Sequence, residues 1–85
     1  LLAQREADVR TLYTTTDPAK AKVILQRYQV NYVYVGPLEQ TTYVQVLGSP
    51  AAALTKFAQF LHPVFKVSGA TLYQVPASIL STNQP

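Results

Sequence analysis

The residues able to carry acid–base or metal chemistry are few and widely spaced in this chain. His62 is the sole histidine, it directly precedes Pro63, and cysteine is absent from the 85 residues. The carboxylates Asp8, Asp17 and Glu39 are far apart in sequence, in contexts typical of helix starts and turns. General acid–base catalysis needs two such groups at one place. The sequence therefore predicts no catalytic residue and no metal site, and His62 is expected to cap a helix end or lie on the surface.

The turn at Gly36-Pro37 carries none of the further glycines that a phosphate-binding loop requires. The single glycine is expected only to allow the chain to turn. The sequence therefore predicts no binding site for a nucleotide or other cofactor. The lack of cysteine also excludes disulfide frameworks, thiolate redox chemistry and zinc fingers.

Two sets of side chains could instead contact a partner. Lys20, Lys22 and Arg27 could form a basic face on one helix, with Tyr28 beneath it, that contacts anionic partners such as nucleic acid or acidic lipid. The other interpretation of this face is a simply solvated helix surface. The chain carries seven basic and four acidic residues, and only 13% of its residues are charged.

The six tyrosines invite a second contact hypothesis, because exposed aromatic rings stack on sugars and nucleobases. Tyr28, Tyr32 and Tyr73 fall on apolar stripes or inside strands, which favours packing in the core. Tyr34 and Tyr43 flank the Gly-Pro turn and are the rings expected to be exposed.

The sequence pattern predicts an α/β (α+β) domain with its elements in helix–strand–helix–hairpin order. These elements would position the residues named above. Asp17-Pro18 is a strong helix start, since Asp17 can accept from free amides and Pro18 needs no donor at the first helical position. The expected elements are helices over 2–13, 18–29 and 50–62, a buried central strand over 30–35, and a hairpin of strands 64–67 and 70–75 around Ser68-Gly69. In the first helix, Val9, Leu12 and Tyr13 are expected to face the core, and Arg5, Glu6, Asp8 and Arg10 to face water.

We expect these elements to form a three-stranded mixed sheet with two or three helices on one face. If the other face is open, Asn31 and the exposed tyrosines mark where a partner would dock. Residues 1–75 are predicted to be one domain and residues 76–85 a flexible tail. The sequence leaves open whether residues 44–55 form a strand, a helix or a loop.

A set of short motifs resembles one family. The set is Arg5-x-x-Asp8-Val9-x-x-Leu12-Tyr13, Asp17, Ala21, Leu25-x-x-Tyr28-x-Val30-x-Tyr32-Val33-Tyr34-Val35-Gly36-Pro37-Leu38-Glu39, Tyr43, Lys56-Phe57, Val64-Phe65 and Thr71-Leu72-Tyr73-x-Val75. It is similar to the carboxy-terminal extramembrane segment of the "YYY" membrane proteins of Chloroflexi and archaea. Those multi-spanning proteins look like relatives of GT-C glycosyltransferases that use lipid-linked sugars. The chain departs from the motif pattern over 44–55.

The resemblance implies a non-catalytic accessory domain on the extracytoplasmic face of the cell membrane. The parent protein would be the transferase, and no residue here corresponds to its acidic catalytic groups. The implied partners are the transmembrane part of the same polypeptide and a glycan or lipid-linked sugar, with Tyr34, Glu39 and Tyr43 as the contact residues. Nucleic acid is not an expected partner in this case. The alternative is an independent binding module that uses the Lys20, Lys22 and Arg27 face.

Overall fold

The computed structural model describes residues 2–81, which begin with two helices. Helix α1 spans Leu2–Thr14 and helix α2 spans Pro18–Arg27. The predicted start of α2 is confirmed, because the Asp17 carboxylate accepts from the Ala19 amide at 2.9 Å and Pro18 occupies the first turn. Lys20 and Lys22 lie on this helix, away from its buried stripe of Ala21, Ile24 and Leu25.

The sheet has three strands, β1 (Tyr32–Val35), β2 (His62–Val67) and β3 (Ala70–Gln74), in the order β1-β3-β2. An α+β domain is therefore confirmed, but both strand pairings are antiparallel, so the sheet is not mixed. The predicted hairpin supplies β2 and β3, with Gly69 at a φ of 79° in its turn. Because β3 takes the centre, β1 and β2 run in the same direction without being neighbours. The strand expected at the centre, β1, lies at an edge instead.

Short helical segments connect β1 to β2. They are α3 (Pro37–Glu39), the π-helix η1 (Gln40–Val46), α4 (Ala52–Thr55) and α5 (Phe57–Phe60). The undecided residues 44–55 thus contain the end of η1, a turn with Gly48 at a φ of 77°, and the whole of α4. Ser49 does not cap the following helix, because Ala51 holds the N-cap position of α4. The helix predicted as continuous up to Pro63 breaks at Lys56 and ends at Phe60, and Pro63 lies within β2.

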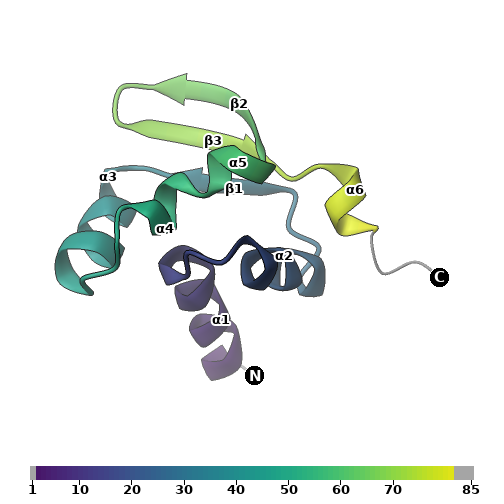
Figure 1. Ribbon diagram of the computed structural model, residues 1–85, viewed down its shortest axis with the longest axis horizontal. Coiled ribbons are helices and arrows are strands. Elements are labelled where there is room, and N and C mark those ends of the chain that lie inside the picture. The colour runs from purple at the N-terminus through teal and green to yellow at the C-terminus, as the bar shows by residue number, and fades with distance from the viewer. Residues whose placement is uncertain (1, 82–85) are drawn as a thin grey trace.

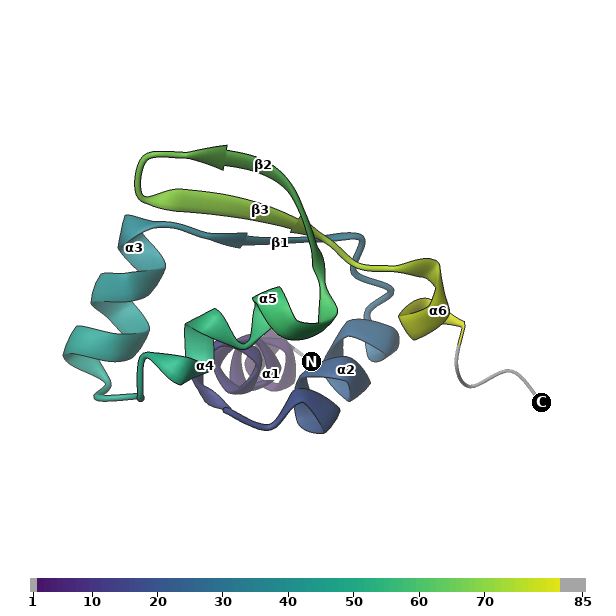
Figure 2. The same ribbon diagram turned by 45° about the horizontal axis from the view of Figure 1, so that its top comes forward.

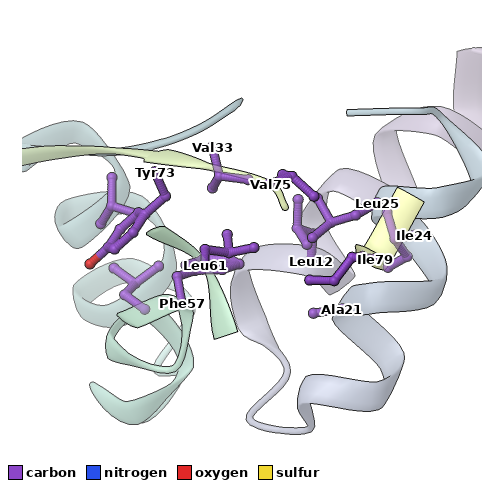
Figure 3. Packing of buried hydrophobic residues seen from close by; sticks show 12 residues of the cluster. Leu12, Ala21, Ile24, Leu25, Val33, Phe57, Leu61, Tyr73, Val75 and Ile79 are labelled. Carbon is purple, nitrogen blue, oxygen red and sulfur yellow. The ribbon is translucent and has the colours of Figure 1, made fainter. Parts of the chain in front are cut away.

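The helices pack against one face of the sheet and leave the other face uncovered (Figures 1 and 2). Val33 and Val35 of β1 and Tyr73 of β3 are buried in the same hydrophobic cluster as Phe57 and Leu25. Figure 3 shows the Tyr73 side chain on the side of the sheet that faces Phe57, and the centroids of these two rings lie 6.1 Å apart. These residues join the two N-terminal helices, the connecting helices and the sheet in one hydrophobic cluster. Burial of apolar surface of this kind is the main stabilising contribution in so small a domain.

Helix α1 packs differently from its predicted pattern. Val9 was expected in the core and Asp8 in water, but Val9 is exposed and Asp8 is buried. The reversal follows from Asp8 finding partners on α2, which stabilise a buried carboxylate. Leu12 is buried as predicted.

A final helix, α6, covers Ala77–Leu80 and lies against α2 (Figure 1). Ile79 is buried in the core cluster, and the Gln26 side-chain amide donates to the Ile79 carbonyl oxygen at 2.8 Å. Residues 77–80 therefore belong to the folded domain rather than to a flexible tail, because Ile79 gains apolar contacts there. Residues 82–85 of the predicted tail lie outside the described residues. Within residues 2–81, no helix is long and apolar enough to cross a membrane.

Candidate functional site

The uncovered face of the sheet is the most prominent candidate surface, and we call it the outer face. The register places Tyr34, Leu72 and Phe65 in one row across all three strands. Tyr32 and Val67 occupy the neighbouring rows on the same side, two residues along their strands. The exposed fractions are 53% for Tyr32, 49% for Tyr34 and 61% for Phe65. Aromatic side chains so exposed on one face mark a surface suited to docking.

The sequence predicted only part of this face. Tyr34 is exposed as expected, whereas Tyr32 was wrongly placed in the core. Tyr43 was expected to be exposed, but it is half-buried because its ring stacks on that of Tyr13. Tyr32 is exposed because β1 is an edge strand with only one covered face. Tyr73 is buried and Tyr28 is half-buried, in agreement with their predicted packing. Asn31, also proposed to mark the open face, is exposed and immediately precedes β1.

Both edges of the sheet carry features that oppose pairing with another strand. Strand β2 contains Pro63, an irregularity between Pro63 and Phe65, and the charged residue Lys66. Prolines, bulges and lysines are common protections of edge strands. On β1, the Tyr13 hydroxyl donates to the Tyr34 carbonyl oxygen at 2.8 Å. The side chains of the outer face are thus the better candidates for contact than the strand edges.

The ring of Tyr34 lies directly over Gly36. A Cβ atom added at Gly36 would come within 2.6 Å of the Tyr34 hydroxyl oxygen. The φ of Gly36 is −134°, a backbone conformation open to any residue, so close approach and not conformation requires glycine here. The absence of a side chain at Gly36 therefore leaves room for the Tyr34 ring.

The three predicted contact residues, Tyr34, Glu39 and Tyr43, gather around Tyr13. Its ring stacks on that of Tyr43 with centroids 4.9 Å apart, and its hydroxyl reaches the Tyr34 carbonyl. Burial, together with the charges of Glu39 and Tyr43, raises the pKa of Tyr13 to about 12. Glu39 accepts from the Gly36 amide at 2.7 Å, so its carboxylate holds the start of α3. Tyr13 was placed in the core by its helical position, but its link to β1 had no signal in the sequence.

The predicted basic face does not form as one free surface. The Arg27 guanidinium forms an ion pair with the Asp8 carboxylate at 2.8 Å, and the Lys22 ammonium lies 5.5 Å from the Phe60 ring centroid. Lys20 is exposed. Of the three predicted cations, Lys20 and Lys22 form no ion pair with a carboxylate within residues 2–81.

Asp8 is the centre of a polar cluster that sequence reasoning missed. Its carboxylate accepts from the Tyr28 hydroxyl at 2.5 Å, from Arg27 and from the Gln4 amide at 3.1 Å. The hydrogen bond from Tyr28 lowers the pKa of Asp8 most, and the Arg27 guanidinium lowers it further. Every partner comes from α1 or the end of α2, so the cluster joins these helices.

His62 lies exposed at the start of β2 and caps no helix in the structure. Within residues 2–81, no three histidine, cysteine or carboxylate side chains are grouped so that they could hold a metal ion.

Comparisons with protein-family models, curated proteins and solved structures give no match to this chain.

Proposed function

We propose that this domain is a non-catalytic docking module that binds through the outer face of its sheet. Its partner is the transmembrane part of the same polypeptide, a multi-spanning membrane protein that resembles GT-C glycosyltransferases. The domain would lie on the extracytoplasmic face of the membrane and serve as an accessory to the parent protein. The possible substrates of that parent are a glycan or a lipid-linked sugar.

The observation that supports this proposal is a row of side chains on the outer face, in which Tyr34 and Phe65 are exposed and the half-buried Leu72 lies between them. When a partner removes apolar and aromatic surface of this kind from water, the free energy of binding becomes more favourable. The protected edges of the sheet favour contact through the face rather than strand addition. The motif resemblance, which runs from Arg5 to Val75, supports the choice of partner.

Glu39 and Tyr43 are less suited to test the proposal than the outer face. Replacement of either by alanine is expected to lower the activity of the parent if they help to hold an acceptor. However, Glu39 binds the Gly36 amide and Tyr43 stacks on Tyr13, so both changes also disturb the fold. Phe65 is a better probe, because its side chain is exposed and it is remote from these contacts.

Labelling of single cysteines in the full-length membrane protein tests the proposal. This domain has no cysteine, so Phe65→Cys and Val23→Cys each add one thiol at a position that is more than half exposed here. We expect a maleimide to label Cys at position 23 rapidly and at position 65 slowly, until detergent separates the domain from its partner. Equal labelling rates at both positions in intact membranes would refute docking through the outer face.

A further inference from the structure

A second surface lies on the helical side of the molecule, away from the outer face. A hollow of about 590 Å³ opens between α1 and η1, and we call it the α1–η1 hollow. Its walls include Arg5, Val9 and Arg10 from α1, and Tyr43, Val46 and Leu47 from η1 and the residue after it. Cationic and apolar side chains thus share one concave surface.

The charge at this hollow is positive. Arg5 and Arg10 form no ion pair within residues 2–81, and Glu6 is the one carboxylate among the lining residues. Asp8, the other carboxylate of α1, is neutralised by Arg27. Arg5 is positioned by the Tyr28 ring, whose centroid lies 5.4 Å from its guanidinium carbon. Two cations therefore face one anion here.

The apolar side chains of the hollow project into solvent. Val46 is 72% exposed and Leu47 is 50% exposed. Gly48 follows them with a φ of 77°, which turns the chain sharply and leaves this pair at the end of η1. Side chains so exposed belong to the rim of the hollow rather than to its floor. A flat apolar phase can cover such a rim, whereas a peptide lying in the hollow would leave it in water.

We propose that the α1–η1 hollow binds the surface of a bilayer that contains anionic phospholipids. Val46 and Leu47 would enter the boundary between head groups and acyl chains, while Arg5 and Arg10 bind lipid phosphates. Apolar side chains flanked by arginines are the usual chemistry of interfacial binding. This surface is separate from the outer face, so the inference does not depend on docking to the parent protein.

Sedimentation of the 85-residue chain with vesicles tests the inference. We expect binding to phosphatidylcholine vesicles that contain phosphatidylglycerol and little binding to phosphatidylcholine alone. Combined Arg5→Gln and Arg10→Gln changes should weaken binding by roughly tenfold or more, since each basic residue near such a surface contributes substantially. Lys20→Gln with Lys22→Gln removes the same charge from α2 and should weaken binding much less. Glu6→Gln should strengthen it.

Several results would overturn the inference. Equal losses in the arginine and lysine double variants would show attraction by net charge alone. Failure of the unchanged chain to bind anionic vesicles would show that the hollow does not bind a bilayer. Equally strong binding of glycerol phosphate or of an acidic amphipathic peptide would show that its ligand is not a bilayer surface.

Insertion of the rim is tested separately by fluorescence. The chain has no tryptophan, so Val46→Trp gives a single emitter at the rim and Val23→Trp a matched emitter on α2. Anionic vesicles should shift the emission of the first variant to the blue and leave the second unchanged. Circular dichroism checks that both variants are folded. Unchanged emission from a folded Val46→Trp variant would contradict insertion.

Discussion

The Lys56 ammonium donates a hydrogen bond to the Leu12 carbonyl oxygen at 2.7 Å, although 44 residues separate the two in sequence. The same nitrogen also donates to the Ala53 carbonyl oxygen and lies 4.0 Å from the Phe57 ring centroid. The side chain is only 2% exposed. The last carbonyl groups of a helix have no hydrogen-bond donor within the helix. The buried Lys56 ammonium provides such a donor for the Leu12 carbonyl near the end of α1.

This burial makes the free energy of unfolding depend on pH. Desolvation lowers the pKa of Lys56 from 10.5 to about 8, which corresponds to roughly 3 kcal/mol. Between these values the unfolded chain binds a proton that the native chain has lost, so stability rises with pH. Below about pH 8 both states are protonated and the full cost of burying the charge is present.

We therefore expect chemical denaturation to show greater stability at pH 9 than at pH 8, a range that lies below the ordinary tyrosine pKa of about 10. Lys56→Met should remove this rise, because no buried amine is left to titrate. Lys66→Met, at an exposed position on β2, is the matched control and should retain it. A rise that persists in Lys56→Met would assign the effect to another group.

The Asp8 cluster predicts a loss of stability in acid. Because hydrogen bonds from Tyr28 and Arg27 lower the pKa of Asp8 below its ordinary 3.8, the stability that this group contributes is present above that value. It is lost as the pH falls toward the lower pKa of the native state. Asp8→Asn should lower the melting temperature at pH 7 and make the acid transition shallower.

Tyr28→Phe in the wild-type and the Asp8→Asn backgrounds separates this cluster from simple packing. Loss of the hydroxyl should cost stability in the wild-type chain and much less once the carboxylate is gone. Equal losses in the two backgrounds would show that the hydrogen bond between these residues contributes nothing measurable.

The close contact between Tyr34 and Gly36 can be tested by enlargement of the glycine. Gly36→Ala should displace the Tyr34 ring and cost about 1 kcal/mol, as overpacking does. In a Tyr34→Ala background the same change should cost little, since the ring that it meets is gone. Thermal unfolding of the four chains gives both values. A full cost in the Tyr34→Ala background would place the clash elsewhere.

Helix α6 is expected to contribute to global stability. Ile79→Ala should lower the free energy of unfolding by roughly 2–4 kcal/mol, because it empties a buried position of the core. Ser78→Ala, at an exposed position of the same helix, controls for helix propensity and should change stability little. If both changes have equally small effects, residues 77–80 are only loosely attached to the domain.

Local signals in the sequence were sufficient for many of the elements. Asp17-Pro18 starts α2, and Ser68-Gly69 forms the hairpin turn, because a helix cap and a tight turn depend on adjacent residues. The edge position of β1 was not predictable in this way. It depends on β3, which comes some 40 residues later and takes the centre of the sheet. The exposure of Tyr32 follows from that pairing.

The burial of the charged residues Asp8 and Lys56 could not be predicted from the sequence either. Asp8 and Lys56 carry charges that normally face water, and their burial depends on partners distant along the chain. Tyr34, Glu39 and Tyr43 lie near one turn of the chain, and their role as contact residues stays a prediction. Their common link, Tyr13, comes from another helix and becomes visible only in the folded chain.

Photo-crosslinking of the full-length protein in its membrane tests docking through the outer face most directly. Benzoylphenylalanine would replace Phe65 on that face or, as a control, Val23 on α2. If the outer face binds the transmembrane part of its own polypeptide, position 65 should give a crosslink within the chain that mass spectrometry maps to a membrane segment, and position 23 should not. Absence of a crosslink at position 65, or the same yield and target from both positions, would contradict docking through this face.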